Sequence, residues 1–461
     1  MKNSGQTTAQ MLLPLVILLG LALAFAYLMP KLTTVQVLFL GGGIVLFAVC
    51  MVSTEAALYL LVFSMLLSPE FIVGGTESAT PLGRGVTLRV DDFILLIIGL
   101  TWIAKMAIHK ELGLFLKTPL NKAVGYYVTV CLISTLLGAV FADVHLKTGF
   151  LFVLKYFEYV FIYFMVANHL RDRAQVRNYV WALLITAVIV SIIGILQIPG
   201  GGRVSAPFEG KIGEPNTFGG YLVFMICIAC GLMLTATESL PRLLYGTMGL
   251  LFFIPLLYTQ SRSSYLAFIP AMLVFVKLSE KRKLILLAFI VGMILLPFVV
   301  PRATKDRIAY TFSQPPGHGQ LVVGGTRIDT STTARLMSWR NVMRDWIRHP
   351  FIGFGVTGYP FVDAQYFRIL IETGVLGLAA FFLMIARIFG QATAVFRTAA
   401  DPMERGLSMG FIAGFVGLLV HAIGANTFII VRIMEPFWFV LAMVIMIPNL
   451  KGENGKLGTE G

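Results

Sequence analysis

The chain has 461 residues, of which 57% are hydrophobic and only 13% are charged. Soluble domains carry roughly twice that charged fraction, so the composition and the mean hydropathy of +0.84 exclude a soluble globular protein. A net charge of +13 would suggest a nucleic-acid partner in a soluble protein, but basic loops of a membrane protein first set its orientation. We therefore expect membrane lipids around the chain and no nucleic acid.

Apolar runs of membrane-spanning length recur along the sequence. A hydrocarbon core about 30 Å thick needs roughly 20 apolar residues per helix. The runs predict an all-α, polytopic fold with about 12 to 14 transmembrane helices, and an uncleaved first span is preferred over a cleaved signal peptide. The predicted spans are 11–29, 34–52, 56–74, 93–108, 123–141, 149–167, 179–198, 217–234, 242–258, 262–278, 284–300, 366–390, 406–423 and 433–448.

Positive charge is shared unevenly between the two sides of these spans. If the N-terminus is cytoplasmic, the short loops on its side hold 18 Lys and Arg residues and those on the other side hold eight. Cytoplasmic loops are enriched in Lys and Arg, so the bias predicts a bacterial inner (plasma) membrane protein with both termini cytoplasmic.

One long polar interval, 301–365, then lies outside, in the periplasm of a Gram-negative cell. It holds eight Lys and Arg residues but four Asp and Glu residues. The expected parts of the chain are N-terminal transmembrane helices 1–92, a central bundle 93–300, the periplasmic loop 301–365, C-terminal transmembrane helices 366–448 and a cytoplasmic tail 449–461.

Charged residues occur inside one predicted span. Lys155 and Glu158 are three residues apart, so they share a helix face on which they can pair. Charge within hydrocarbon is costly and often functional, so Lys155 is a candidate for substrate contact, with a structural ion pair as the alternative.

The predicted outer loop around 200–216 is rich in glycine and also charged. Arg203 and Lys211 are candidates for contact with an anionic substrate, with solvated loop cations as the alternative. Glu214 and Asn216 lie where the next helix begins, and Asn216 is expected to be its N-cap.

A tight polar hairpin, Tyr258–Ser264, places Arg262 near the membrane surface at the head of a predicted helix. The N–H groups and dipole of a helix N-terminus add to a guanidinium to form an anion site. The alternative is that Arg262 extends to phospholipid headgroups, and we favour the anion site.

The segment Thr333–Arg348 has the period of an amphipathic helix within the long loop, and one of the residues 330–332 is its expected N-cap. Arg335 lies at the edge of the apolar face. Three further arginines lie progressively further from that face, so we expect them to form a solvated stripe: Arg340, Arg344 and Arg348. The apolar residues of the helix are Leu336, Trp339, Met343, Trp346 and Ile347.

Asp363 precedes the span that begins at Tyr366. An N-cap role would explain it. As the acid next to several arginines and the membrane surface, it is also the best candidate for a general base.

Taken together, these segments resemble the O-antigen ligase and polymerase family of bacterial inner-membrane glycosyltransferases. The resemblance covers about residues 90–425 and depends on the order and spacing of its pieces. These are KYFEYVFIYFMVANHLR at 155–171, EPNTFGGYL at 214–222, SRS at 261–263, Arg335 with Trp339, HPFIGFGVTGY at 349–359 and ETGVLG at 372–377.

The resemblance implies an all-helical glycosyltransferase whose donor is an oligosaccharide on undecaprenyl diphosphate. The family's hairpin arginine corresponds to Arg262, and its loop-helix arginine to Arg335. Ligases of the family begin the following span with a His-Asn pair, whereas this chain has Asp363 and Ala364. His349 does not fill that position, so the departure favours a polymerase over a ligase.

The predicted function is periplasmic polymerisation or transfer of a lipid-linked oligosaccharide by an inverting enzyme that needs no metal or other cofactor. Arg262 and Arg335 would stabilise the diphosphate leaving group, and Asp363 would take the acceptor proton. The alternatives are a ligase to lipid A core or protein and, in another class, a lipid-linked oligosaccharide flippase. A chain-length regulator is a candidate partner. The candidate substrate-binding residues are Arg203, Lys211, Glu214, Asn216, Lys155, Arg340, Tyr366 and Arg368.

Overall fold

This computed structural model describes residues 34–73, 86–108, 118–141, 144–209, 213–314, 320–323 and 326–450. The predicted span 11–29 and candidate Lys211 lie outside the described residues. The helices of the first half are α2 (Thr34–Val52), α3 (Thr54–Leu67), α4 (Val90–Ile108), α5 (Asn121–Val140), α6 (Leu146–His169), α7 (Arg173–Gln197), η2 (Ile198–Gly200) and α8 (Pro215–Thr235). Those of the second half are α9 (Ser239–Tyr258), α10 (Arg262–Leu278), α11 (Arg282–Val299), α12 (Arg302–Ser313), α13 (Thr330–Trp346), α14 (Gln365–Thr398), α15 (Pro402–His421), η3 (Thr427–Ile429), α16 (Val431–Met446) and η4 (Ile447–Asn449).

The described residues include nine helices that are long and apolar enough to cross a membrane. These are α5, α6, α7 with η2, α8, α9, α11, α14, α15 and α16 with η4. The protein is therefore a multi-pass membrane protein, as the sequence predicts. Two other predicted spans are shorter helices, α3 with 14 residues and α10 with 17 residues.

The predicted span 56–74 is wrong at its C-terminal end. Helix α3 stops at Leu67, where the sequence continues Ser68-Pro69, because a residue before proline is disfavoured in helical conformation. Strand β1 (Glu70–Val73) follows and pairs antiparallel with β2 (Val86–Arg89). A second small hairpin joins β3 (Val322–Val323) to β4 (Thr326–Arg327), and these short strands leave the fold helical.

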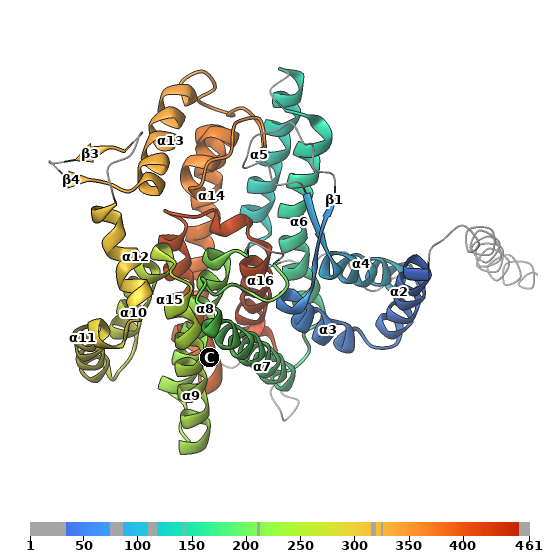
Figure 1. Cartoon of the computed structure of the whole chain (residues 1–461). Coiled ribbons are helices and arrows are strands. Elements are labelled where there is room, and N and C mark those ends of the chain that lie inside the picture. The colour runs from blue at the N-terminus through green and yellow to red at the C-terminus, as the bar shows by residue number, and fades with distance from the viewer. Residues whose placement is uncertain are drawn as a thin grey trace, which may run out of the picture.

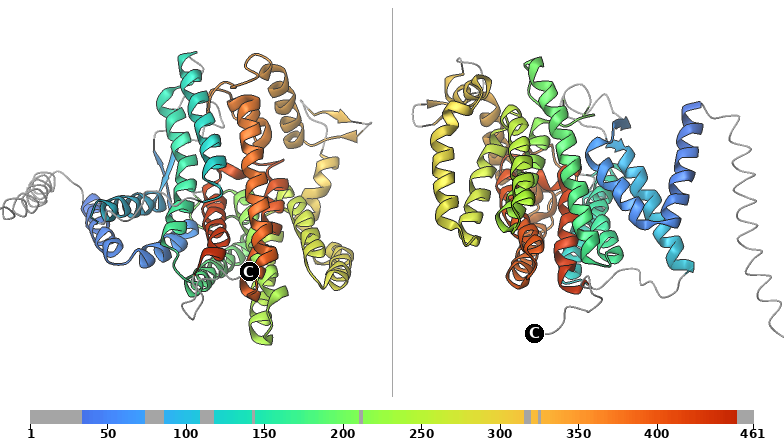
Figure 2. Two further views of the ribbon diagram at one scale, coloured as in Figure 1. Left: turned by 180° about the vertical axis from the view of Figure 1, so that it is seen from behind. Right: turned by 90° about the horizontal axis from the view of Figure 1, so that it is seen from below.

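Helices α8, α15 and α16 form the centre of the bundle, and most of their residues are buried (Figure 1). Close packing of α8 on α15 depends on small residues, because a Cβ at Gly231 would lie 2.3 Å from the Gly406 carbonyl oxygen. Helices α2 and α11 lie at opposite edges of the molecule (Figure 2). None of the residues of α11 is buried, as expected for a helix surrounded by lipid.

The polar interval between α11 and α14 contains more helix than the sequence analysis predicted. Helices α12 and α13 and the β3–β4 hairpin gather at one end of the bundle (Figure 1). Helix α13 begins at Thr330, and its N-cap is Asp329, whose carboxylate accepts a hydrogen bond from the Thr332 amide. The predicted cap within 330–332 is therefore wrong by one residue. The predicted solvated stripe is confirmed, because all three of its arginines are exposed, namely Arg340, Arg344 and Arg348.

The glycine-rich connector, residues 349–359, closes against an interruption in α14. Gly374 has φ +65° and ψ −167°, so α14 is two helices joined at this residue. The connector fills the gap, because the amides of Phe354 and Gly355 donate to the carbonyls of Ile371 and Glu372 at 2.9 and 2.8 Å. A side chain at Gly374 would meet the Phe351 carbonyl at 2.3 Å, so the close approach requires glycine.

Candidate functional site

An open cleft of about 350 Å³ lies where the polar interval meets the ends of α8 and α10. Its lining is polar, and half of the residues are arginines. The lining residues are Arg203, Asn216, Gln260, Arg262, Ser263, Arg307, Ser331 and Arg335. We call it the arginine cleft. Four of the predicted site residues meet here, namely Arg203, Asn216, Arg262 and Arg335.

Arg262 is the first residue of α10, as predicted, and it binds the polar interval to the membrane helices. Ser261 caps this helix by accepting a hydrogen bond from the Ser264 amide. The Arg262 Nη2 atom lies 3.0 Å from Asp329 Oδ2 and 2.6 Å from Ser331 Oγ, while Nη1 donates to Thr311 Oγ1. Arg262 thus contacts both α12 and the N-terminus of α13.

Asp329 is the buried carboxylate that faces Arg262, with only 3% of its side chain exposed. Burial alone would raise its pKa. The hydrogen bonds from Arg262, Ser331 and Thr332, together with the charge of Arg262, instead lower the pKa of Asp329 to about 2. Asp329 is therefore ionised at neutral pH and compensates the charge of Arg262.

Arg335 forms a second ion pair at the cleft. Its Nη2 and Nε atoms lie 3.0 and 3.3 Å from Asp363 Oδ2. Both side chains stay accessible, with 28% of Arg335 and 39% of Asp363 exposed. Asp363 is not the N-cap of α14, because Ala364 holds that position. One turn further along each helix, Trp339 stacks on Phe367 with ring centroids 4.9 Å apart, which fixes α13 against α14.

Arg203 approaches the cleft from the loop that precedes α8. Its Nε donates to the Thr259 carbonyl at 3.0 Å, and its Nη2 donates to the Gln260 carbonyl at 3.4 Å. Burial and then the positive charge of Arg307 lower the pKa of Arg203, with smaller effects from Arg262 and Arg335. The positive charges of the four arginines lie within one cleft, so the electrostatic potential there is positive.

Arg307, on α12, is a cleft residue that the sequence analysis did not assign to the site. Within the described chain, its side chain makes no hydrogen bond or ion pair, and it is half-buried in the cleft. Gln260, Ser263 and Ser331 were missed as well. A signal for α12 was present, because Pro301 is followed by thirteen residues without glycine or proline, a pattern typical of a helix start.

Asn216 lines the cleft without capping α8. Pro215 is the first residue of α8 and Glu214 holds the cap position, so the predicted N-cap is wrong. Proline is favoured at the first position of a helix, where its missing N–H is not needed. The carboxylate of Glu214 accepts a hydrogen bond from Thr217 Oγ1 at 2.9 Å, and Glu214 is not part of the cleft lining.

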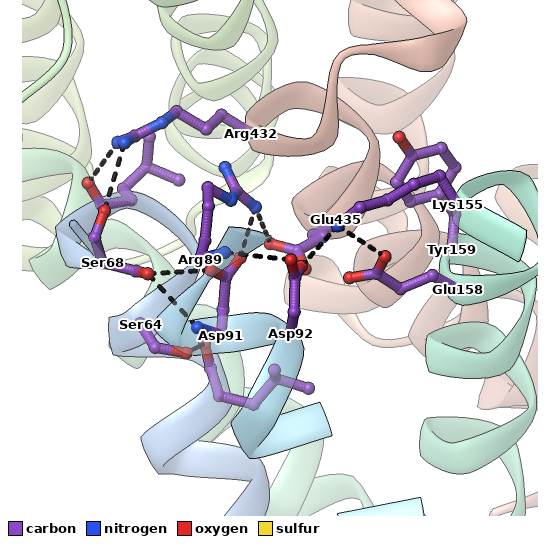
Figure 3. A network of polar contacts seen from close by, with 12 residues as sticks. Ser64, Ser68, Arg89, Asp91, Asp92, Lys155, Glu158, Tyr159, Arg432 and Glu435 are labelled. Atoms are coloured by element: carbon purple, nitrogen blue, oxygen red, sulfur yellow. Dashed lines mark hydrogen bonds and ion pairs between the residues drawn. The ribbon is translucent and has the colours of Figure 1, made fainter. Parts of the chain in front are cut away.

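Lys155 belongs to a separate buried network (Figure 3). Its Nζ lies 2.6 Å from Asp92 Oδ1 and 3.0 Å from Glu158 Oε2, which confirms the predicted pair with Glu158. Nearby, Arg89 pairs with Asp91 and with Glu435 of α16. The network joins β2, α4, α6 and α16, so Lys155 helps to hold these elements together. Its substrate contact stays a prediction.

Arg368, Tyr366 and Arg340 also lie away from the cleft lining. Arg368 is buried and pairs with Glu372 at 3.1 Å, with the Phe152 and Phe361 rings beside its guanidinium. The Tyr366 hydroxyl donates to the Leu419 carbonyl at 2.6 Å. Arg340 is exposed on α13.

Part of the chain is similar to a known protein family. Residues 247–382 match the family described as O-antigen ligase (Wzy_C). The matched segment contains Arg262, Arg307, Arg335 and Asp363, whereas Arg203 lies outside it. No protein of curated function matches the chain. The chain is thus a multi-pass membrane protein in which residues 247–382 are similar to the O-antigen ligase family.

Proposed function

We propose that this protein is a glycosyltransferase that transfers an oligosaccharide from a polyprenyl diphosphate, undecaprenyl diphosphate in bacteria, to a growing glycan. The charge of the arginine cleft carries the proposal. Asp329 compensates Arg262 and Asp363 compensates Arg335, so about two of the four positive charges stay uncompensated. A diphosphate esterified at both ends carries two negative charges, and guanidinium groups bind phosphate oxygens in pairs.

Asp363 is the proposed general base. Asp363 is not part of the cleft lining, but it pairs with Arg335, which is, and 39% of its side chain is exposed, so an acceptor sugar can reach it beside the cleft. In the proposed step, Asp363 takes the proton of the acceptor hydroxyl, whose oxygen bonds to the anomeric carbon of the donor sugar. The bond from that carbon to the diphosphate oxygen breaks, and the electron pair stays on the diphosphate. Direct displacement of this kind inverts the anomeric configuration.

The arginines replace a metal ion in this proposal. Charge builds on the diphosphate as its bond breaks, and preorganised guanidinium groups stabilise such developing charge. Four arginines already line the cleft before substrate binds. Transfer is therefore expected to continue in the presence of a chelator.

The proposed orientation places both termini in the cytoplasm and the arginine cleft at the periplasmic face. Its support is the bias of Lys and Arg toward the loops on the side of the termini. Because nucleotide sugars are absent from the periplasm, the substrate must arrive already activated, as a lipid diphosphate does.

A polymerase is the preferred role, and a ligase is the second candidate. Asp363 and Ala364 stand where the family's ligases have His-Asn, which favours a polymerase. The description of the matching family favours a ligase. The two differ in the acceptor, which is another lipid-linked repeat unit for a polymerase and lipid A core or a protein for a ligase.

A reconstituted assay tests the proposal. The purified full-length protein in nanodiscs receives a defined undecaprenyl-diphosphate repeat unit, with or without lipid A core and with or without EDTA. Growth of a glycan ladder without lipid A core is expected for a polymerase, and EDTA should not change it. A product formed only with lipid A core would identify a ligase. No transfer to either acceptor would contradict the proposed function.

A further inference from the structure

We propose that Arg307 is the residue that captures the diphosphate of the incoming lipid-linked glycan. This inference rests on the proposed function, and it assigns substrate binding to a residue outside the arginines that the resemblance supplies. Arg262 and Arg335, through their ion pairs with Asp329 and Asp363, then fix the walls of the cleft in which Arg307 binds the substrate.

The partners of the four cleft arginines single out Arg307. Arg262 is held by Asp329, and Arg335 by Asp363, each at 3.0 Å. Arg203 donates to two backbone carbonyls of the α9–α10 turn. Among the residues that the structure describes, Arg307 alone of the four has no hydrogen bond or ion pair from its side chain. An arriving anion therefore gains most from Arg307, because no existing contact must be broken.

The position of α12 directs Arg307 into the cleft. Thr304 is 1% exposed, and its hydroxyl donates to the Leu257 carbonyl at 2.7 Å. Thr311 accepts a hydrogen bond from Arg262, and its carbonyl accepts one from the Asp329 amide at 2.9 Å. Arg307 follows Thr304 by three residues and precedes Thr311 by four, so all three share one face of α12. Both anchors fix this face against the α9–α10 turn.

The same helix provides matched controls. Arg302 and Lys305 carry the same charge as Arg307, but both are exposed. At 100° per residue they lie on the opposite side of α12 from Arg307. A general loss of positive charge from the polar interval can therefore be separated from the loss of one guanidinium within the cleft.

Arg203 is the expected second contact of the diphosphate. Arg203 and Arg307 line the same cleft, and the charge of Arg307 is the largest electrostatic effect on Arg203, so one anion in the cleft would be attracted by both. Binding of a diphosphate between them would remove their mutual repulsion. A monophosphate places less charge between the two groups, so the pair should favour the diphosphate.

Binding of undecaprenyl diphosphate and undecaprenyl monophosphate to the full-length protein in nanodiscs tests this inference. Arg307→Ala should weaken binding of the diphosphate by about 10- to 100-fold, the effect of losing a hydrogen bond to a charged group. Arg307→Lys should retain part of the affinity, and Arg302→Ala should bind as the wild type does. The thermal unfolding midpoint of Arg307→Ala should match the wild type, because its side chain makes no hydrogen bond or ion pair with the residues that the structure describes.

The outcomes separate this inference from the proposed function. If the wild type binds the diphosphate and Arg307→Ala binds it equally well, the role of Arg307 is refuted while the glycosyltransferase proposal stands. An equal loss of affinity in Arg302→Ala would also refute it, because only general electrostatics would then act. If the wild type binds neither lipid, the proposed function itself fails.

Discussion

Asp363 Oδ2 accepts hydrogen bonds from two nitrogens of Arg335, at 3.0 and 3.3 Å. Asp363 directly precedes Ala364, the N-cap of α14, so this pair joins α13 to the start of α14. Under the proposed mechanism the pair does more than hold two helices. When Asp363 takes a proton, it loses its charge and no longer compensates Arg335. The leaving diphosphate gains one negative charge in the same step. Arg335 thus becomes available to the product as the charge of the product grows.

Replacing the carboxylate separates binding from chemistry. Asp363→Asn should lower the transfer rate by about 100- to 10,000-fold, the usual contribution of a general base. Because Arg335 is then uncompensated at all times, the variant should bind undecaprenyl diphosphate at least as tightly as the wild type. Initial transfer rates and equilibrium binding of the lipid give the two quantities.

Asp345 provides the control for this substitution. It is an acid of the same polar interval that pairs with the exposed Arg344 and accepts a hydrogen bond from the Tyr359 hydroxyl, which an amide oxygen can still accept. Asp345→Asn should leave the transfer rate close to that of the wild type. A wild-type rate in Asp363→Asn would remove the proposed base, and weaker binding of the lipid would remove the proposed effect on Arg335.

The Arg262–Asp329 pair predicts how the polar interval responds to acid. The pKa of Asp329 is lowered to about 2, so its contribution to stability is fully present above its ordinary value near 4. That contribution is lost as the pH falls from about 4 to about 2. Protection of 302–346 from pepsin should therefore persist to about pH 4 and decline below it.

An amide at the same position should remove most of that dependence. Asp329→Asn keeps an N-cap side chain but loses the charge that faces Arg262, so the segment should be less protected at every pH, by about 1 kcal/mol. Asp306→Asn on the exposed side of α12 serves as the control. A wild-type protection profile in Asp329→Asn would show that the pair does not stabilise the interval.

The sequence predicted those parts of the site that depend on local pattern. Arg262 was found because a polar hairpin before an apolar run predicts a helix N-terminus, and Arg335 because of its place on an amphipathic wheel. Arg307 could not be found in this way. Its neighbours in sequence include equally basic residues, and what distinguishes Arg307 is that its side chain has no hydrogen-bond or ion-pair partner within the part of the chain that the structure describes. Pairing of Arg262 with Asp329, 67 residues away, is likewise a property of the fold.

The errors have similar physical causes. Asn216 is a good cap by residue type, but Pro215 already begins α8. Lys155 was a candidate for substrate contact because charge in a membrane is costly, and that contact stays a prediction. Its pairing with Asp92 was not predicted, because Asp92 lies 63 residues earlier in the chain and no local pattern reveals it.

The buried network predicts a loss of stability when Lys155 is replaced. Lys155→Met leaves Asp92 and Glu158 without their shared cation, at a cost of about 3 kcal/mol. The folded fraction should still transfer glycan at the wild-type rate. Thermal unfolding in detergent and transfer rates normalised to folded protein test both points. Lys147→Ala, on the exposed start of α6, should change neither. Unchanged stability with a raised KM would instead support direct contact between Lys155 and the substrate.

The interruption of α14 gives the sharpest test of the fold around the site. At φ +65° and ψ −167°, Gly374 occupies a region that is nearly restricted to glycine. An added Cβ would also meet the Phe351 carbonyl carbon and oxygen at 2.3 Å. Gly374→Ala should therefore lower the free energy of unfolding by about 3 kcal/mol and displace the glycine-rich connector from α14.

Gly390 is the matched control within the same helix. Nothing lies within 4 Å of a Cβ added there, so Gly390→Ala should be neutral or stabilise the protein by up to about 1 kcal/mol. Thermal unfolding of both variants in detergent gives the comparison. Because the connector precedes Asp363 in the chain, Gly374→Ala should also slow transfer, while Gly390→Ala should not. Equal stability of the two variants would show that α14 can continue through residue 374 as a regular helix, and that the connector does not need the interruption.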